Sequence, residues 1–93
     1  MTNTIKIIQI NYDLCSSDRN YYAVGSYIQS QGDYTHPLQS QWFVATNKTA
    51  SQIRDEIANH IGPRDAVLVV DVTGAMWAST FANSTTEWMQ AHL

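Results

Sequence analysis

The segment Ile5–Asp13 reads Ile-Lys-Ile-Ile-Gln-Ile-Asn-Tyr-Asp. The fold that we predict for the whole chain is built around this segment. Its isoleucines are β-branched and favour an extended backbone, so we predict a β-strand. Successive side chains of a strand point to opposite faces. One face is apolar and is expected in the core: Ile8, Ile10 and Tyr12. The other begins apolar and becomes polar, and is expected on an open sheet face: Ile5, Ile7, Gln9, Asn11 and Asp13.

A helix is expected after this strand. Ser17 or Asp18 can serve as its N-cap, and the helix is predicted to run to about Gln31, where Gly32 ends it. Gly25 weakens a helix by roughly 1 kcal/mol relative to alanine, which suggests a close contact at that position.

Three more strands follow from the sequence pattern. Tyr34–Leu38 and Gln41–Thr46 form a predicted hairpin, and Pro37 assigns the first of them to a sheet edge because proline has no amide donor for the ladder. Ala66–Thr73 is almost continuously apolar, so we expect a strand that is buried on most of both faces.

Two capping boxes predict two further helices. Thr49 as N-cap and Gln52 three residues later open the first, and Gly62-Pro63 ends it. Its buried stripe is expected at Ile53, Ile57 and Ile61. The second box, Ser84 to Glu87, opens a short terminal helix that buries Trp88 and Leu93. The apolar segment 74–81 between strand and helix is expected to fold back over the core.

This order predicts one α+β domain spanning residues 1–93. Two interleaved strand–helix–strand units give a ferredoxin-like βαββαβ fold, with a four-stranded antiparallel sheet and a short C-terminal helix. The first strand is expected between the third and the fourth, which would bring Asp13 close to Ser40 and Asp65. The expected core shares the helix side of the sheet: Ile8, Ile10, Val24, Ile28, Ile53, Ile57, Ile61, Leu68 and Val70.

The amino-acid composition limits the classes of function that we expect. The single cysteine, Cys15, excludes an internal disulfide and fits a reducing, cytoplasmic setting, and no stretch has the length of a membrane span. Five basic residues oppose eight acidic ones, and the net charge of −3 disfavours binding along a nucleic-acid duplex. His36, His60 and His92 are scattered, and we expect each to be structural or solvated.

The chain resembles the CRISPR-associated protein 2 superfamily. The resemblance rests on the aliphatic first strand ending in Tyr12-Asp13, on Gly32 after the first helix, and on Gln39-Ser40-Gln41-Trp42-Phe43 in the hairpin. The alternation through the hairpin and the terminal Glu87-Trp88 look most similar to its SinR-like branch, which shares the fold with VapD-like toxins. The resemblance implies a small ferredoxin-like dimer in which Asp13 is a metal ligand.

Two functions follow as alternatives. In the first, paired Asp13 carboxylates hold Mg²⁺, with neutral oxygens from Asn11 and Ser40, and the protein is a metal-dependent nuclease or toxin acting on RNA or DNA. In the second, the protein is a non-catalytic dimeric module, and Asp13 only ends the strand and orders the next loop. Either way we expect a homodimer through the open sheet face. The apolar patch expected to form it is Ile5, Ile7, Val67 and Val69.

Overall fold

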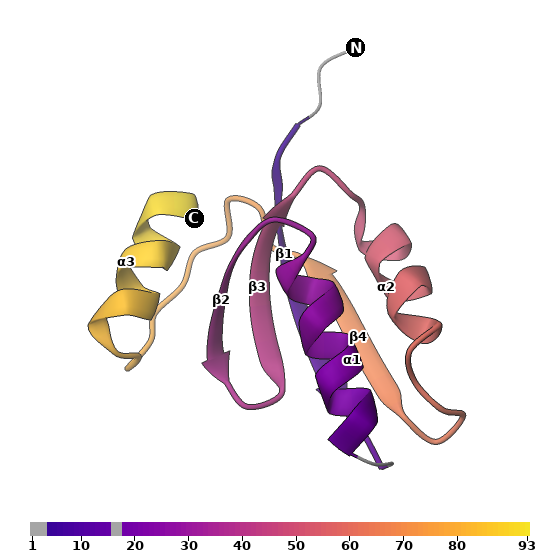
Figure 1. Ribbon diagram of the computed structural model, residues 1–93. Helices are drawn as coiled ribbons and strands as arrows, with labels where there is room; N and C mark the ends of the chain where they lie inside the picture. The colour runs from indigo at the N-terminus through magenta and orange to yellow at the C-terminus, as the bar shows by residue number, and fades with distance from the viewer. Residues whose placement is uncertain (1–3, 16–17) are drawn as a thin grey trace.

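The computed structural model describes residues 4–15 and 18–93, except for the side chains of residues 18 and 19. Its elements are β1 (Lys6–Asp13), α1 (Asp18–Gln29), β2 (Asp33–Leu38), β3 (Gln41–Thr46), α2 (Ala50–Ala58), β4 (Ala66–Asp71) and α3 (Asn83–His92) (Figure 1). The strands form one antiparallel sheet in the order β2-β3-β1-β4. This confirms the predicted α+β class, the ferredoxin-like strand order and the C-terminal helix.

The connection from α1 to β2 depends on a glycine. A Cβ atom at Gly32 would collide with the carbonyl oxygen of Ala45, so a side chain cannot be accommodated there. The helix itself ends at Gln29, two residues before the predicted end. Of its two predicted caps, Ser17 lies outside the described residues, and the side chain of Asp18 is not described.

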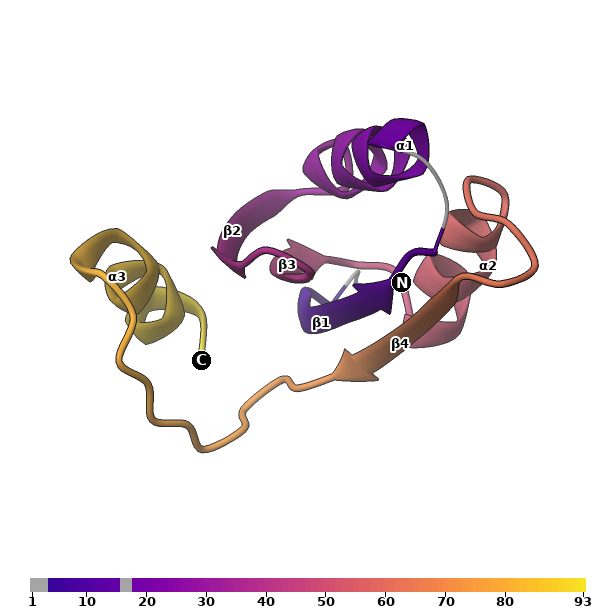
Figure 2. The same ribbon diagram turned by 90° about the horizontal axis from the view of Figure 1, so that it is seen from below.

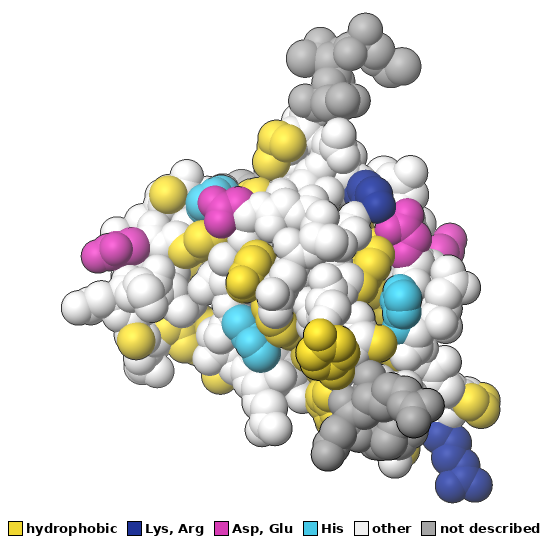
Figure 3. Space-filling model, in the orientation of Figure 1, with side chains coloured by type: hydrophobic (Ala, Val, Ile, Leu, Met, Phe, Trp, Pro, Cys, Tyr) yellow, Lys and Arg dark blue, Asp and Glu magenta, His cyan; other side chains and the backbone are white. Residues whose placement is uncertain are grey.

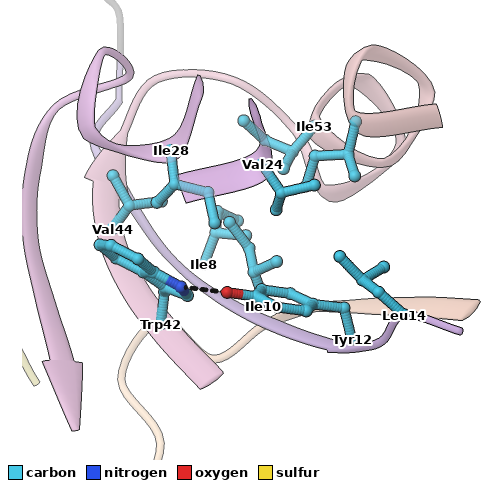
Figure 4. Packing of buried hydrophobic residues seen from close by; sticks show 10 residues of the cluster. Ile8, Ile10, Tyr12, Leu14, Val24, Ile28, Trp42, Val44 and Ile53 are labelled. Carbon is cyan, nitrogen blue, oxygen red and sulfur yellow. Dashed lines mark hydrogen bonds between the residues drawn. The ribbon is translucent and has the colours of Figure 1, made fainter. Parts of the chain in front are cut away.

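The main core lies between the sheet and the pair α1 and α2, which cover the same sheet face (Figure 2). The apolar face of β1 supplies its centre, as predicted, and Ile8 and Ile10 have no solvent exposure. Figure 4 shows these side chains meeting residues from both helices. The buried members of this cluster are Ile8, Ile10, Tyr12, Leu14, Val24, Ile28, Trp42, Val44, Ile53 and Ile57.

Trp42 joins β3 to both α1 and β1. A Cβ atom at Gly25 would lie 3.4 Å from Cζ2 of the Trp42 indole, so the close contact expected at this glycine is present. On the other side, Trp42 Nε1 donates a hydrogen bond of 2.8 Å to the Tyr12 hydroxyl (Figure 4). Burial raises the pKa of Tyr12, although this hydrogen bond acts in the opposite direction.

The helix α2 begins and packs as its sequence predicts. Thr49 and Gln52 form both hydrogen bonds of the capping box. Ile53 and Ile57 are fully buried, and Ile61, which follows the helix, is partly buried against the same cluster. Complete burial of one such side chain contributes about 1.5–3 kcal/mol, so this stripe fixes the position of α2 on the sheet.

The predicted assignment of the β4 side chains to the two sheet faces is wrong, because the two sets of alternating residues are exchanged. Ile10 lies opposite Val69 and Tyr12 opposite Val67, and opposed residues share a face, so Val67 and Val69 pack against the main core. Leu68 and Val70 therefore lie on the other face, and Leu68 is 62% exposed. A nearly continuous apolar run gives no alternation from which its facing could be predicted.

The helix α3 covers part of the second sheet face. Its residue Met89 packs with Ile7 and Phe43, which are only 4% and 5% exposed. Trp77 and Phe81 of the preceding segment pack against this second cluster, as expected, whereas Met76 is 99% exposed. Within the described residues, none of the helices is both long and apolar enough to cross a membrane.

The predicted capping box of this helix is wrong. The N-cap is Ala82, which has no side-chain cap hydrogen bond, and Ser84 lies inside the first turn. The Thr86 hydroxyl donates to the carbonyl oxygen of Phe81 at 3.2 Å. Packing of Phe81 and Met89 against the sheet thus outweighs the local capping signal.

Candidate functional site

Asp13 ends β1 at a shallow hollow on the second sheet face. It is exposed and lies opposite Ala66 in the ladder between β1 and β4. The predicted approach of Asp13 to Asp65 is therefore confirmed, since Asp65 directly precedes that residue. The hollow is lined by Asn11, Tyr12, Asp13, Ala66, Val67 and Leu68.

A row of amide side chains crosses the sheet beside this hollow. Gln41 donates its amide to Oδ1 of Asn11 at 3.0 Å. The Asn11 amide in turn donates to Gln9 Oε1 at 3.1 Å and approaches the carbonyl oxygen of Leu68 at 3.4 Å. The Asn11 oxygen is thus already occupied as an acceptor, and a metal ion would have to compete with Gln41 for it.

The three residues expected as metal ligands lie at one end of the sheet. Asn11 and Asp13 share a face of β1, and the Ser40 carbonyl oxygen accepts the Tyr12 amide at 3.1 Å, which places Ser40 beside the end of the same strand. Across the part of the chain that is described, no three or more His, Cys, Asp or Glu side chains form a group suited to a metal ion. Asp13 supplies a charged oxygen donor, the kind of ligand that a hard cation prefers, among these three residues.

One of the two alternatives for Asp13 is that it orders the loop after β1, but in the described part of that loop the carboxylate that accepts a backbone amide belongs to Asp65. Its Oδ1 accepts the Cys15 amide at 2.8 Å, and its Oδ2 accepts the Gly62 amide at 2.8 Å and the Asn20 side-chain amide at 3.1 Å. One carboxylate thereby joins the loop after β1 to the loop before β4. Asp13 makes no hydrogen bond or ion pair with any residue that the structure describes.

The apolar patch predicted on the open face has a different composition. Ile7 is covered by α3, and Val67 and Val69 face the helices. What α3 leaves uncovered is a strip across β1 and β4, because α3 lies towards β2 and away from β4 (Figure 2). We call this surface the open strip, and its members are Gln9, Asn11, Leu68 and Val70.

Sequence reasoning missed Leu68 and Val70 because the apolar run of β4 hides its facing. The hydrogen bonds of Asp65 were also not predicted; its partners Cys15 and Gly62 precede it in the chain by 50 and 3 residues. A local signal was present only for the Gly62 contact, since an aspartate that follows Gly-Pro-Arg is typical of a turn.

The three histidines take part in structural contacts. The His36 ring stacks on Trp42 with 3.7 Å between centroids, and His60 lies 5.7 Å from the ring of Tyr27. His92 stacks on Trp88, and its Nε2 lies 3.1 Å from the Asp33 carboxylate of β2. Basic side chains do not gather on the face drawn in Figure 3, where they lie apart from one another.

Comparisons of this chain with family models, with curated proteins and with solved structures find no match.

Proposed function

We propose that this protein is a non-catalytic interaction module that acts as a homodimer, with the open strip as part of the surface that binds the second copy. The observation that supports this most is Leu68, a large apolar side chain that is 62% exposed in the middle of a strand. Exposed apolar surface of this kind is typical of a protein–protein contact. A two-fold dimer needs only one self-complementary surface.

The polar part of the strip also favours a protein partner. Asn11 donates a hydrogen bond to Gln9 and accepts one from neighbouring Gln41, so covering the Asn11 side chain leaves neither its nitrogen nor its oxygen unpaired. The net charge of −3 disfavours a polyanion on this surface. A reducing, cytoplasmic setting is part of the proposal, because the exposed thiol of Cys15 would otherwise be open to oxidation.

Light scattering over a concentration series tests the proposal. We expect a particle of twice the chain mass of 10.5 kDa at high micromolar concentration, with dissociation on dilution. A particle of 10.5 kDa at the highest concentration would remove the proposed function.

A metal-dependent nuclease or toxin acting on RNA or DNA is the second candidate, and the exposed carboxylate of Asp13 is the observation in its favour. A Mg²⁺ ion held between two Asp13 carboxylates would supply charge neutralisation at a phosphate and an activated water. The resemblance to the CRISPR-associated protein 2 superfamily supports this candidate as well.

Mg²⁺ titrations with an Asp13→Asn control separate the two candidates. If Asp13 holds a metal, millimolar Mg²⁺ raises the melting temperature of the wild type but not that of Asp13→Asn, and nuclease activity disappears in Asp13→Ala. If Mg²⁺ changes the melting temperature of neither the wild type nor Asp13→Asn, and the wild type cleaves neither RNA nor DNA, the non-catalytic module remains as the function.

A further inference from the structure

The two edges of the sheet are protected to very different degrees. The β2 edge contains Pro37, has an irregular register between Thr35 and Leu38, and is contacted by α3 through the pair formed by His92 and Asp33. These are features with which proteins block pairing at an exposed edge. The β4 edge reads Ala-Val-Leu-Val-Val-Asp, with no proline, no basic residue and a regular register throughout.

The free edge of β4 presents a regular set of backbone groups. Val72 donates its amide to the carbonyl oxygen of Ile7 on β1 at 2.9 Å. Backbone amides along a strand point alternately to its two sides. Val67, Val69 and Asp71 therefore direct their amides and carbonyl oxygens away from β1, towards the side where the sheet ends.

We infer that this edge pairs with β4 of a second copy, antiparallel and with the two-fold axis at Val69, so that the two sheets become one. The inference rests on the proposed function, because it specifies how the two copies meet. In this register Val67 lies opposite the partner's Asp71, and Val69 lies opposite the partner's Val69. Each outward-pointing amide then meets an outward-pointing carbonyl oxygen, as strand addition requires.

The side chains of β4 fit the same arrangement. Leu68 lies opposite the partner's Val70 on the second sheet face, so the exposed apolar side chains of the open strip pack across the axis. The strand has one charged residue, Asp71 at its end, and the two residues before the strand, Arg64 and Asp65, have opposite charges. Antiparallel pairing keeps the two Asp71 side chains at opposite ends of the paired strands, whereas in-register parallel pairing would place these like charges side by side.

This geometry also bears on the second candidate function. Asp13 lies beside Ala66, at the start of β4. In the inferred register the two Asp13 side chains lie near opposite ends of the paired strands, about 20 Å apart along the strand direction at about 3.4 Å per residue. One metal ion cannot bridge them, so edge pairing and a shared Asp13 metal site exclude each other.

Amide hydrogen exchange measured by NMR at low and high protein concentration tests the inference. In the monomer the amides of Val67, Val69 and Asp71 face solvent and should exchange rapidly. When about nine tenths of the chains are dimeric, we expect these amides to exchange about tenfold more slowly, because exchange then proceeds through the remaining monomer. The amide of Met76, which is outside the sheet, serves as the control and should not change.

The possible outcomes are distinct. A dimer by light scattering whose Val67, Val69 and Asp71 amides still exchange rapidly would overturn edge pairing in favour of face-to-face packing, and would leave the proposed function standing. A monomer at all concentrations would overturn both. Slowing at these amides that follows addition of another protein, but not the concentration of this chain, would assign the edge to a different partner and overturn the inference.

Discussion

Asp13 and Asp65 lie at the same end of the sheet but differ in their hydrogen-bonded contacts with the rest of the protein. Asp65 accepts hydrogen bonds from the amides of Cys15 and Gly62 and from the Asn20 side chain, and so connects two loops. Asp13 is exposed and makes no such contact among the described residues. A role in stability is therefore expected for Asp65 and not for Asp13.

Asp65→Asn should destabilise the protein by about 1–3 kcal/mol, because an amide nitrogen at Oδ2 would face the Gly62 amide and leave that donor unsatisfied. Asp13→Asn is the matched control and should change the free energy of unfolding by less than about 0.5 kcal/mol. Urea denaturation measures both values. Equal losses in the two variants would contradict the division of roles.

Sequence reasoning could place Asp13 but could not find the function of Asp65. Asp13 ends a strand whose alternation is visible in the sequence itself. The contacts of Asp65 with Cys15 and Asn20 span 50 and 45 residues, and they exist only because β1 and β4 become neighbours. No local pattern contains such a contact.

At the scale of elements, β1, α2 and the hairpin could be predicted from local sequence signals. These signals are a regular spacing of apolar residues, a helix cap, or a proline or glycine that limits the element. The helix α2 has a capping box and a spaced isoleucine stripe, and both are present. The strand β4 and the helix α3 were mispredicted in detail because tertiary contacts decide them. Pairing with β1 sets the facing of Leu68, and packing of Phe81 and Met89 sets the start of α3.

The start of α3 offers a stabilising substitution. Ala82 is the N-cap and has the extended backbone of a capping residue, with φ −62° and ψ 160°, but it has no side-chain acceptor. Ala82→Asp should cap the first turn and interact favourably with the helix dipole, which raises the stability by about 1 kcal/mol. Thermal unfolding measures the gain, and Ala78→Asp in the exposed segment before α3 is the control. Equal melting temperatures in the two variants would argue against this helix start.

The contacts of Glu56 on α2 make stability depend on pH. Its carboxylate accepts hydrogen bonds from Lys48 at 2.7 Å and from the Tyr27 hydroxyl, and these hold the pKa of Glu56 below its usual value. A lowered folded-state pKa gives stabilisation that is present above the unfolded pKa of about 4.3 and is lost as the pH falls through the folded pKa. Because both side chains are about one third exposed, we expect less than about 1 kcal/mol.

Urea denaturation near pH 7 and near pH 3.5 tests this dependence. The loss of stability on acidification should be smaller in Glu56→Gln than in the wild type, because the substituted side chain does not titrate. Asp55→Asn, on the same helix and paired with exposed Arg54, is the control. A wild-type loss that Glu56→Gln leaves unchanged would show that Glu56 does not contribute to it.

At the scale of the whole molecule, the sheet is covered unevenly. One face is covered by α1 and α2, and the other only partly by α3, so β4 has both an exposed apolar side chain and an unprotected edge (Figure 2). The alternation of β1 was enough to predict a second sheet face that α1 and α2 do not cover. It could not predict that α3 covers the β2 side, because that depends on where residues 72–82 direct the helix.

The measurement that tests self-association through β4 most directly is the dimer dissociation constant of Leu68→Lys compared with that of Leu38→Lys, by sedimentation equilibrium. Both leucines are more than half exposed, so neither change should unfold the protein, but Leu38 ends β2 at the opposite edge of the sheet. A lysine on an edge strand opposes pairing, so we expect Leu68→Lys to weaken the dimer by about tenfold or more and Leu38→Lys to leave it unchanged. Equal dissociation constants for the two variants, or a weaker dimer only in Leu38→Lys, would contradict the proposed interface.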